Sequence, residues 1–291
     1  MVDIGPECVR SLVSKSARYA STMVGEAVEF GPECLNLVRS MTLDRRLRPR
    51  NREPYYSLLD EYSPGERLGA SKNPVLLLHG WMQNGSMLTL MRDALRGRSI
   101  LAYRVHHNPW IDRLDNVDRV ARVVDEILDR TGAERIDVIG HSLGGLDARL
   151  LALRTGKVED CITVASPNRG IRIAEMHPLV KLIGVDSASV RQMRVGSSIL
   201  EVINGPDGFV DGTNYVSIYS PADTLVPSSR SPLHRGINID IDEMLGLSNI
   251  GHGRIIVSNR TLSLMTSIVN SKYRFAERAR WGTVLDSSVL A

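Results

Sequence analysis

The feature that most constrains this chain is the pentapeptide Gly140–Gly144, which reads Gly-His-Ser-Leu-Gly and lies between a β-type run and a helical pattern. The run Arg135–Ile139 precedes it, and leucines at helical spacing follow it from Leu143 onward. A serine at a sharp strand-to-helix turn is raised out of the sheet, and the flanking glycines leave room for the strained backbone. The pattern therefore predicts a mainly parallel α/β sheet with Ser142 as a nucleophile at the positive end of a helix.

The rest of the chain agrees with such a sheet. From about residue 74 onward, short apolar runs alternate with helical patterns, which is typical of βαβ units. Six runs are predicted as strands: Pro74–Leu78, Ile100–Val105, Arg135–Ile139, Asp160–Ala165, Tyr215–Ser220 and Gly236–Ile241. Helices are predicted between them, at residues 86–96, 113–130, 143–155 and 254–269. The segment 171–211 breaks this rhythm with mixed helical patterns, and we interpret it as an inserted helical cap.

Residues 1–65 are predicted to form a helical extension, and residues 66–291 the catalytic domain. The repeated Gly-Pro-Glu-Cys at 5–8 and 31–34 opens two predicted helices, because proline and glutamate suit a first helical turn. The first helix carries one apolar stripe, which favours docking on a protein surface. The arginine run at 45–52 leaves peripheral contact with lipid as the alternative.

Composition limits the other classes of function. A chain of 291 residues with 43% hydrophobic and 24% charged residues suits one globular catalytic domain with an extension. A formal net charge of +3 gives no case for nucleic-acid binding. The cysteines Cys8, Cys34 and Cys161 form neither a CxxC pair nor a zinc spacing, so we expect no metal and a reducing compartment. Neither a secretory leader nor a run of about 18 apolar residues is visible, so the cytoplasm is the expected location, with secretion left open.

The acid and the base that activate such a serine follow it in the chain, in that order. Asp223 directly follows the predicted strand Tyr215–Ser220, and open α/β sheets place their sites at the carboxyl ends of strands. Of the later histidines, His177 lies in the predicted cap, His234 precedes the last strand, and His252 follows it between two glycines. We therefore predict Asp223 as the acid and His252 as the base.

Two backbone N–H groups near the serine are needed to hold a developing oxyanion. One is expected from Leu143, the residue after the nucleophile. The other is expected from the loop after the first core strand, which reads His79-Gly80-Trp81, and we assign it to Trp81.

At these residues the chain resembles the bacterial lipases and related esterases of the α/β-hydrolase superfamily. The resemblance runs from about Pro74 to Leu264. It is carried by His79-Gly80, the Gly140–Gly145 turn, Ala165–Gly170, Asp223 with Val226-Pro227, and His252. It implies the α/β-hydrolase fold and a carboxylic ester or acylglycerol hydrolase that works through an acyl-enzyme without a cofactor. The segment 171–211 then corresponds to the family's cap or lid.

The predicted cap holds more apolar residues than a solvent-facing crossover needs, so part of it is expected to line an acyl site. Ile183 and Leu200 of the cap, facing Met82, Met87 and Leu88 beyond the oxyanion loop, are the candidate substrate-binding residues. This arrangement favours medium or long acyl chains on a small-molecule or lipid ester. The oligomeric state is not predicted.

The predicted catalytic triad of Ser142, Asp223 and His252 leaves other reactions open. A thioesterase, an amide hydrolase or an acyltransferase uses the same residues, because fold and triad do not choose the leaving group or the acceptor. A non-catalytic α/β-hydrolase scaffold that binds lipid or a partner is an alternative from a different class.

Overall fold

The computed structural model describes residues 55–60, 73–81, 83–172 and 187–270. The chain separates into two compact units, Met1–Arg48 and Pro49–Ala291, and the α/β sheet lies in the second. Several predictions fall outside the described residues: the two N-terminal helices, Met82, and residues 173–186 of the predicted cap, which include His177 and Ile183.

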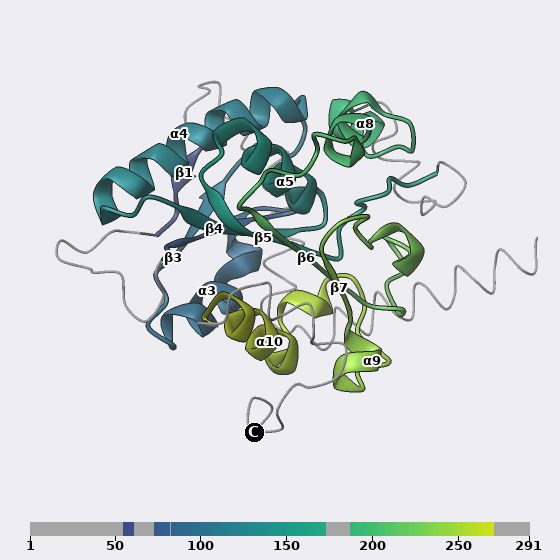
Figure 1. Cartoon of the computed structure of the whole chain (residues 1–291). Helices are drawn as coiled ribbons and strands as arrows, with labels where there is room; N and C mark the ends of the chain where they lie inside the picture. Colours follow the sequence, from purple (N-terminus) through teal and green to yellow (C-terminus); the bar gives the residue numbers. More distant parts are fainter. Residues whose placement is uncertain (1–54, 61–72, 82, 173–186, 271–291) are drawn as a thin grey trace, which may run out of the picture. The chain divides into compact units, whose positions relative to one another are not determined.

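Six parallel strands form the centre of the second unit (Figure 1), in the order β3-β2-β4-β5-β6-β7, with a short antiparallel strand β1 beside β3. The predicted mainly parallel sheet of about six strands is confirmed. Because helices cover both of its faces, strands such as β2 are buried throughout and read as continuous apolar runs. The strands are β1 (Ser57–Leu58), β2 (Val75–Leu78), β3 (Ala102–His106), β4 (Ile136–His141), β5 (Val158–Val164), β6 (Asn214–Tyr219) and β7 (Ile237–Asp240).

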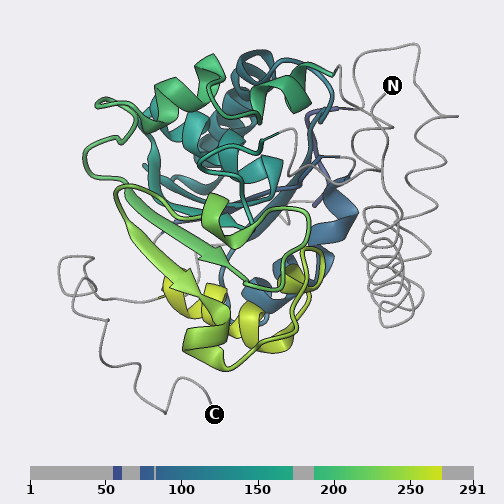
Figure 2. The ribbon, with the colours of Figure 1, turned by 90° about the vertical axis from the view of Figure 1, so that its right-hand side faces the viewer.

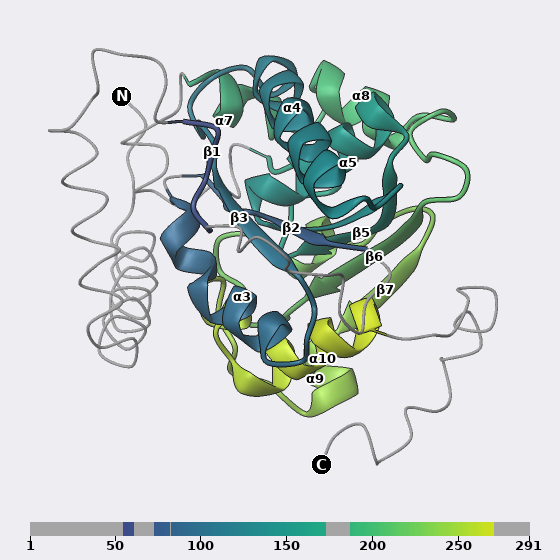
Figure 3. The same cartoon turned by 90° about the vertical axis from the view of Figure 1, so that its left-hand side faces the viewer.

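Helices flank the sheet on both faces. The α-helices are α3 (Thr89–Arg96), α4 (Arg113–Thr131), α5 (Leu143–Thr155), α7 (Ala188–Gln192), α8 (Ser198–Asn204), α9 (Ile241–Leu245) and α10 (Asn259–Asn270). Three short 3₁₀ helices are η1 (Gly85–Leu88), η2 (Ser228–Arg230) and η3 (Arg254–Ile256). Figure 3 shows α4, α5, α7 and α8 on one face and α3, α9 and α10 on the other, and Figure 2 shows the same two layers from the opposite side. Among the described residues, no helix is long and apolar enough to cross a membrane.

Each face of the sheet has its own apolar core. One core joins the sheet to α4, α5, α7 and α8, and the other joins it to α3, α9 and α10. Side chains of successive residues in β2 alternate between the two, with Leu76 and Leu78 in the first and Val75 and Leu77 in the second. The sheet is therefore the rigid layer that fixes where the loops at its carboxyl end lie.

The edge strand β1 is held by a buried carboxylate. Asp60 is 5% exposed and accepts the backbone N–H of Arg104 at 2.7 Å. It also pairs with the Arg104 guanidinium at 2.7 Å and with Arg92. Burial tends to raise the pKa of Asp60, but its bonds to Arg104 and Arg92 outweigh this and hold the pKa below its usual value. Residues 57–60 therefore belong with the sheet, whereas the predicted extension ran to residue 65.

A buried acidic pair lies near the amino ends of β4 and β5, away from the carboxyl ends of the strands. Asp137 is 3% exposed, and its Oδ1 accepts Asn73 Nδ2–H at 3.0 Å and the backbone N–H of Asp160 at 3.1 Å. Burial, together with the negative charges of Asp160 and Glu159, raises the pKa of Asp137 to about 8, and these two hydrogen bonds oppose the rise. The folded protein therefore holds a proton on this carboxyl at neutral pH.

Substitution Asp137→Asn is expected to stabilise the protein more at pH 9 than at pH 5. In the wild type the folded pKa exceeds the unfolded one, so the stability contributed by the bound proton is lost as the pH rises from about 4 through 8. The slope for one proton approaches about 1.4 kcal/mol per pH unit. Asparagine stays neutral and keeps Oδ1 for both donors. Urea unfolding at the two pH values measures the difference.

The matched control is Asp118→Asn on the surface of α4, where the carboxylate pairs with Arg154 in solvent. Its effect on the free energy of unfolding should be small and should not grow with pH in this way. An increase in the free energy of unfolding of Asp137→Asn that is equal at pH 5 and pH 9 would contradict the raised pKa of Asp137.

Candidate active site

The strand-to-helix turn forms as predicted. β4 ends at His141, α5 begins at Leu143, and Ser142 between them has φ 55° and ψ −122°. A positive φ is uncommon for a residue other than glycine and costs of order 1–3 kcal/mol, so the surroundings must hold it. The Ser142 N–H donates to Val164 O at 2.8 Å, and Ser142 O accepts the Gly145 N–H at 3.0 Å. The neighbouring strand and the first turn of α5 therefore fix Ser142 in this conformation.

The glycines of the motif are required by close packing of the turn. A Cβ on Gly140 would lie 2.1 Å from Gly144 O, and one on Gly144 would lie 2.4 Å from Leu78 O. A Cβ on Gly145 would lie 2.0 Å from Ser166 Oγ. All three distances are shorter than any contact that a real Cβ makes. Side chains at these positions would push the turn away from β2 and β5.

The loop after β2 lies directly against the serine. A Cβ on Gly80 would lie 2.9 Å from Ser142 Cβ, so only glycine permits this approach. The backbone of Trp81, the predicted second oxyanion donor, follows immediately. Leu143, the predicted first donor, is the first residue of α5, and its N–H belongs to the amides that lack an intrahelical partner. The structure thus brings both predicted segments to Ser142.

Gln83 joins this loop to the turn, and the sequence carried no motif that singled it out. Its Oε1 accepts the Gly80 N–H at 2.8 Å and lies 3.0 Å from His141 Nδ1. His141 Nε2 lies 2.9 Å from the carbonyl oxygen of His252, so both ring nitrogens face acceptor oxygens, and a neutral ring donates to only one of them. His141 therefore contacts both the loop of Gly80 and the loop of His252.

The predicted acid and base are in contact. His252 Nδ1 lies 2.7 Å from Asp223 Oδ2, and the two residues are 8% and 7% exposed. The other oxygen, Asp223 Oδ1, accepts the backbone N–H groups of Leu225 at 2.9 Å and Val226 at 2.8 Å. The rings of His252 and His141 are 4.8 Å apart, so this pair lies beside the residue that precedes Ser142. The alternative base His234 is exposed.

Three further histidines near Ser142 are neutral. Burial lowers the pKa of His79 to about 3 and lowers the pKa values of His107 and His141 well below the usual value. These rings therefore act as directional hydrogen-bonding groups rather than as cations at neutral pH.

The predicted substrate-binding residues are not all placed in one cleft. Leu88 is 1% exposed and packs in the core on the α3 side, whereas Leu200 is 4% exposed and packs in the core on the α5 side. Met87 is half-buried against the α3-side core. Leu88 and Leu200 therefore serve as core residues on opposite faces of the sheet, because composition alone does not distinguish a core residue from a cleft lining.

A model of the alpha/beta hydrolase family matches residues 75–245, which is more than half of the chain and runs from β2 to the end of α9. This chain belongs to the alpha/beta hydrolase family. The matched region includes Ser142 and Asp223 and ends before His252.

Two solved lipase structures are similar to this chain in fold. The mature form of a Bacillus licheniformis lipase, BlEst2, has a TM-score of 0.61 at 16% identity and covers 74% of this chain and 98% of its own. Aspergillus fumigatus lipase B has a TM-score of 0.62 at 18% identity and covers 74% of this chain and 56% of its own. At these low sequence identities the similarity shows a shared fold alone.

Proposed function

We propose that this chain is a serine hydrolase that cleaves carboxylic esters, with Ser142 as nucleophile, His252 as base and Asp223 as acid. The observation that carries the proposal is the 2.7 Å contact between His252 Nδ1 and Asp223 Oδ2, beside the turn that bears Ser142. An ionised carboxylate only accepts, so Nδ1 carries the proton and Nε2 presents a lone pair. That tautomer is the one that takes a proton from a serine hydroxyl.

In the proposed reaction, His252 Nε2 takes the proton of Ser142 Oγ as this oxygen attacks the ester carbonyl. The N–H groups of Trp81 and Leu143 hold the negative oxygen of the tetrahedral intermediate, with the positive end of α5 beneath it. The intermediate collapses to an acyl-enzyme, and His252 returns the proton to the leaving alcohol. Water then repeats the cycle on the acyl group and releases the acid.

Carboxylic esters with medium or long apolar acyl chains are the proposed substrate class. The similar structures carry the names of lipases, and Trp81 and Trp110 place a pair of aromatic rings, 5.4 Å apart, on the proposed oxyanion loop and on the segment before α4. Trp110 is 40% exposed, so apolar surface is available next to this loop. A thioesterase, amide hydrolase or acyltransferase with the same triad is distinguished by its leaving group or acceptor.

A panel of p-nitrophenyl esters from acetate to palmitate tests the reaction and the chain length together. We expect kcat/KM to rise with chain length, because each buried methylene contributes up to about 0.8 kcal/mol, close to fourfold per group until the site is full. A thioester and an amide with the preferred acyl chain are measured in parallel. A flat or falling profile from acetate upward would contradict the proposed acyl site, and faster cleavage of the thioester or amide would change the reaction class.

A further inference from the structure

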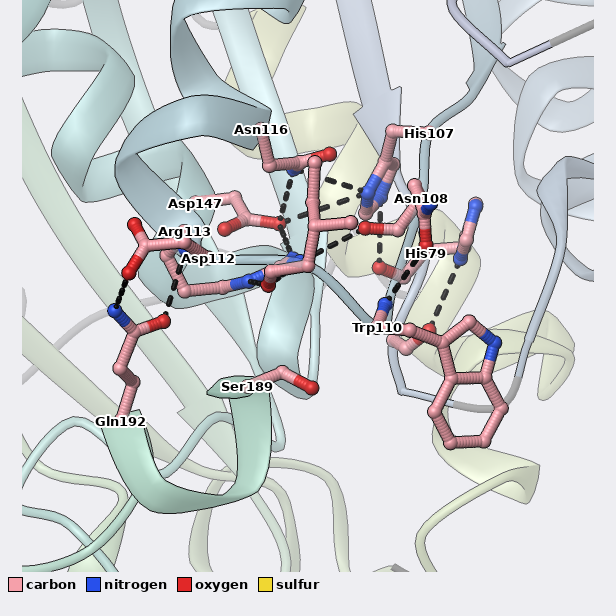
Figure 4. Close-up of polar contacts among 12 residues, drawn as sticks. His79, His107, Asn108, Trp110, Asp112, Arg113, Asn116, Asp147, Ser189 and Gln192 are labelled. Atoms are coloured by element: carbon pink, nitrogen blue, oxygen red, sulfur yellow. Dashed lines mark hydrogen bonds and ion pairs between the residues drawn. The ribbon is translucent and has the colours of Figure 1, made fainter. Parts of the chain in front are cut away.

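A buried polar network connects the loop of Gly80 to the first turns of α4 and to α7 (Figure 4). His107, directly after β3, is 0% exposed. Its Nε2 lies 3.0 Å from the backbone oxygen of His79, and because that oxygen only accepts, Nε2 is the donor. The two imidazole rings also stack, with centroids 3.9 Å apart and 17° between their planes. His107 thus contacts His79 through both its ring and its proton.

The tautomer of His107 is fixed from its other side. A neutral ring with its proton on Nε2 presents a lone pair on Nδ1, and Asn116 Nδ2–H donates to it at 3.2 Å. The orientation of the Asn116 amide is fixed in turn, since its Nδ2 also donates to Asp147 Oδ2 at 3.1 Å and its Oδ1 accepts the Tyr56 hydroxyl at 3.0 Å. Each hydrogen bond in this series has one donor and one acceptor, so a single arrangement of protons satisfies all of them.

A buried ion pair anchors the network. Asp147 and Arg113 are both 0% exposed, and Arg113 Nη1 donates to Asp147 Oδ2 at 3.0 Å. Burial raises the pKa of Asp147 to about 6, with Arg113 opposing the rise, so the carboxyl is ionised and accepting at neutral pH. The Arg113 backbone N–H donates to Gln192 Oε1 of α7 at 2.9 Å, and Gln192 Nε2 donates to Asp112 Oδ2 at 2.6 Å.

We propose that His107 is a positioning residue for the oxyanion loop. The carbonyl that it holds is that of His79, in the same peptide unit as the Gly80 N–H that donates to Gln83 Oε1, and the following N–H along the chain is that of Trp81. This inference rests on the proposed function, because it assigns that N–H to the oxyanion. A donor stabilises the oxyanion only at about 2.7–3.1 Å from it, so a small displacement of the loop weakens the transition state more than substrate binding.

Two substitutions test the N–H donor of His107 and its stacked ring separately. His107→Phe keeps the stacked ring and removes the donor to His79 O, whereas His107→Gln keeps an N–H donor at a similar distance from Cα. We expect His107→Phe to lower kcat for ester hydrolysis about ten- to hundredfold, with KM within about threefold, since loss of a whole oxyanion donor costs about 10²–10³ in kcat. His107→Gln should recover most of the loss.

Val124→Ala is the matched control, because Val124 is 0% exposed on α4, the helix that carries Asn116, and lies outside the network. It should weaken the fold and leave kcat within about twofold. Equal kcat losses in His107→Phe, His107→Gln and Val124→Ala would overturn the proposal, as would a rise in KM with unchanged kcat. If His107→Phe does not fold, Asn116→Ala replaces it, and an unchanged kcat in that variant would equally overturn it.

Hydrogen exchange of the amides at residues 79–83 tests the positioning role of His107 independently of the proposed function. We expect faster exchange in His107→Phe than in the wild type, and wild-type exchange in Val124→Ala. A wild type that cleaves no ester would remove the proposed function, whatever the exchange shows. Unchanged exchange in His107→Phe would remove the positioning role, whatever the activity of the wild type.

Discussion

Substitution Ser142→Ala is expected to lower kcat for ester hydrolysis by at least about 10³-fold while the protein stays folded. Without Oγ no acyl-enzyme forms, and loss of a triad serine costs about 10⁶ in a well-studied serine protease. Alanine keeps a Cβ and the two backbone bonds that hold residue 142 to Val164 and Gly145, so the positive φ is retained. The free energy of unfolding should therefore change by less than about 1 kcal/mol.

Steady-state kinetics on the preferred p-nitrophenyl ester, together with urea unfolding, measure both parts of this expectation. Ser267→Ala on α10 is the matched control, because it removes a serine hydroxyl that bonds only to its own helix in the described structure. It should retain wild-type kcat. A folded Ser142→Ala variant with more than about a tenth of the wild-type activity would contradict the assignment of the nucleophile.

Substitution Asp223→Asn is expected to lower kcat by about 10²–10⁴-fold, because it reverses the tautomer of His252. Asp223 Oδ1 accepts the N–H groups of Leu225 and Val226, so an asparagine would keep its oxygen there and turn its Nδ2–H toward His252 Nδ1. Nδ1 would then accept, and the proton would move to Nε2, where it blocks transfer from the serine. The loop geometry is preserved, so the loss is chemical rather than structural.

The rates of Asp223→Asn and His252→Ala are measured between pH 6 and pH 9, with unfolding measured in parallel. His234→Ala is the control, since His234 is exposed and comes earlier in the chain than His252. It should stay within a few-fold of the wild type. Loss of activity in His234→Ala with activity retained in His252→Ala would show that the base was assigned to the wrong histidine.

The sheet and the order of the candidate site residues could be predicted because their signals are local. Buried strands covered on both faces leave continuous apolar runs, and each of the six predicted strands is present with ends shifted by a few residues. The turn around Ser142 is encoded by glycines that the packing requires. The pairing of Asp223 with His252 follows from their positions after strands, since the carboxyl ends of parallel strands share one edge of the sheet.

The remaining features depend on contacts between distant segments. Gln83 meets His141 across 58 positions of the chain, and Asn116 meets Asp147 across 31, so no local pattern marks them. The strand β1 has two residues, which is too short for an alternating pattern. Leu200 is apolar, but core residues and substrate contacts are both apolar. Only its position in the structure distinguishes the two roles.

Labelling with a fluorophosphonate tests the central claim, that Asp223 and His252 activate Ser142, most directly. Intact mass spectrometry of the labelled full chain should show one adduct per chain, and peptide mapping should place it on Ser142. Labelling should be absent in Ser142→Ala, much slower in Asp223→Asn, and unchanged in Ser267→Ala. An active wild type that forms no adduct, or an adduct that persists at the same rate in Ser142→Ala, would contradict the account.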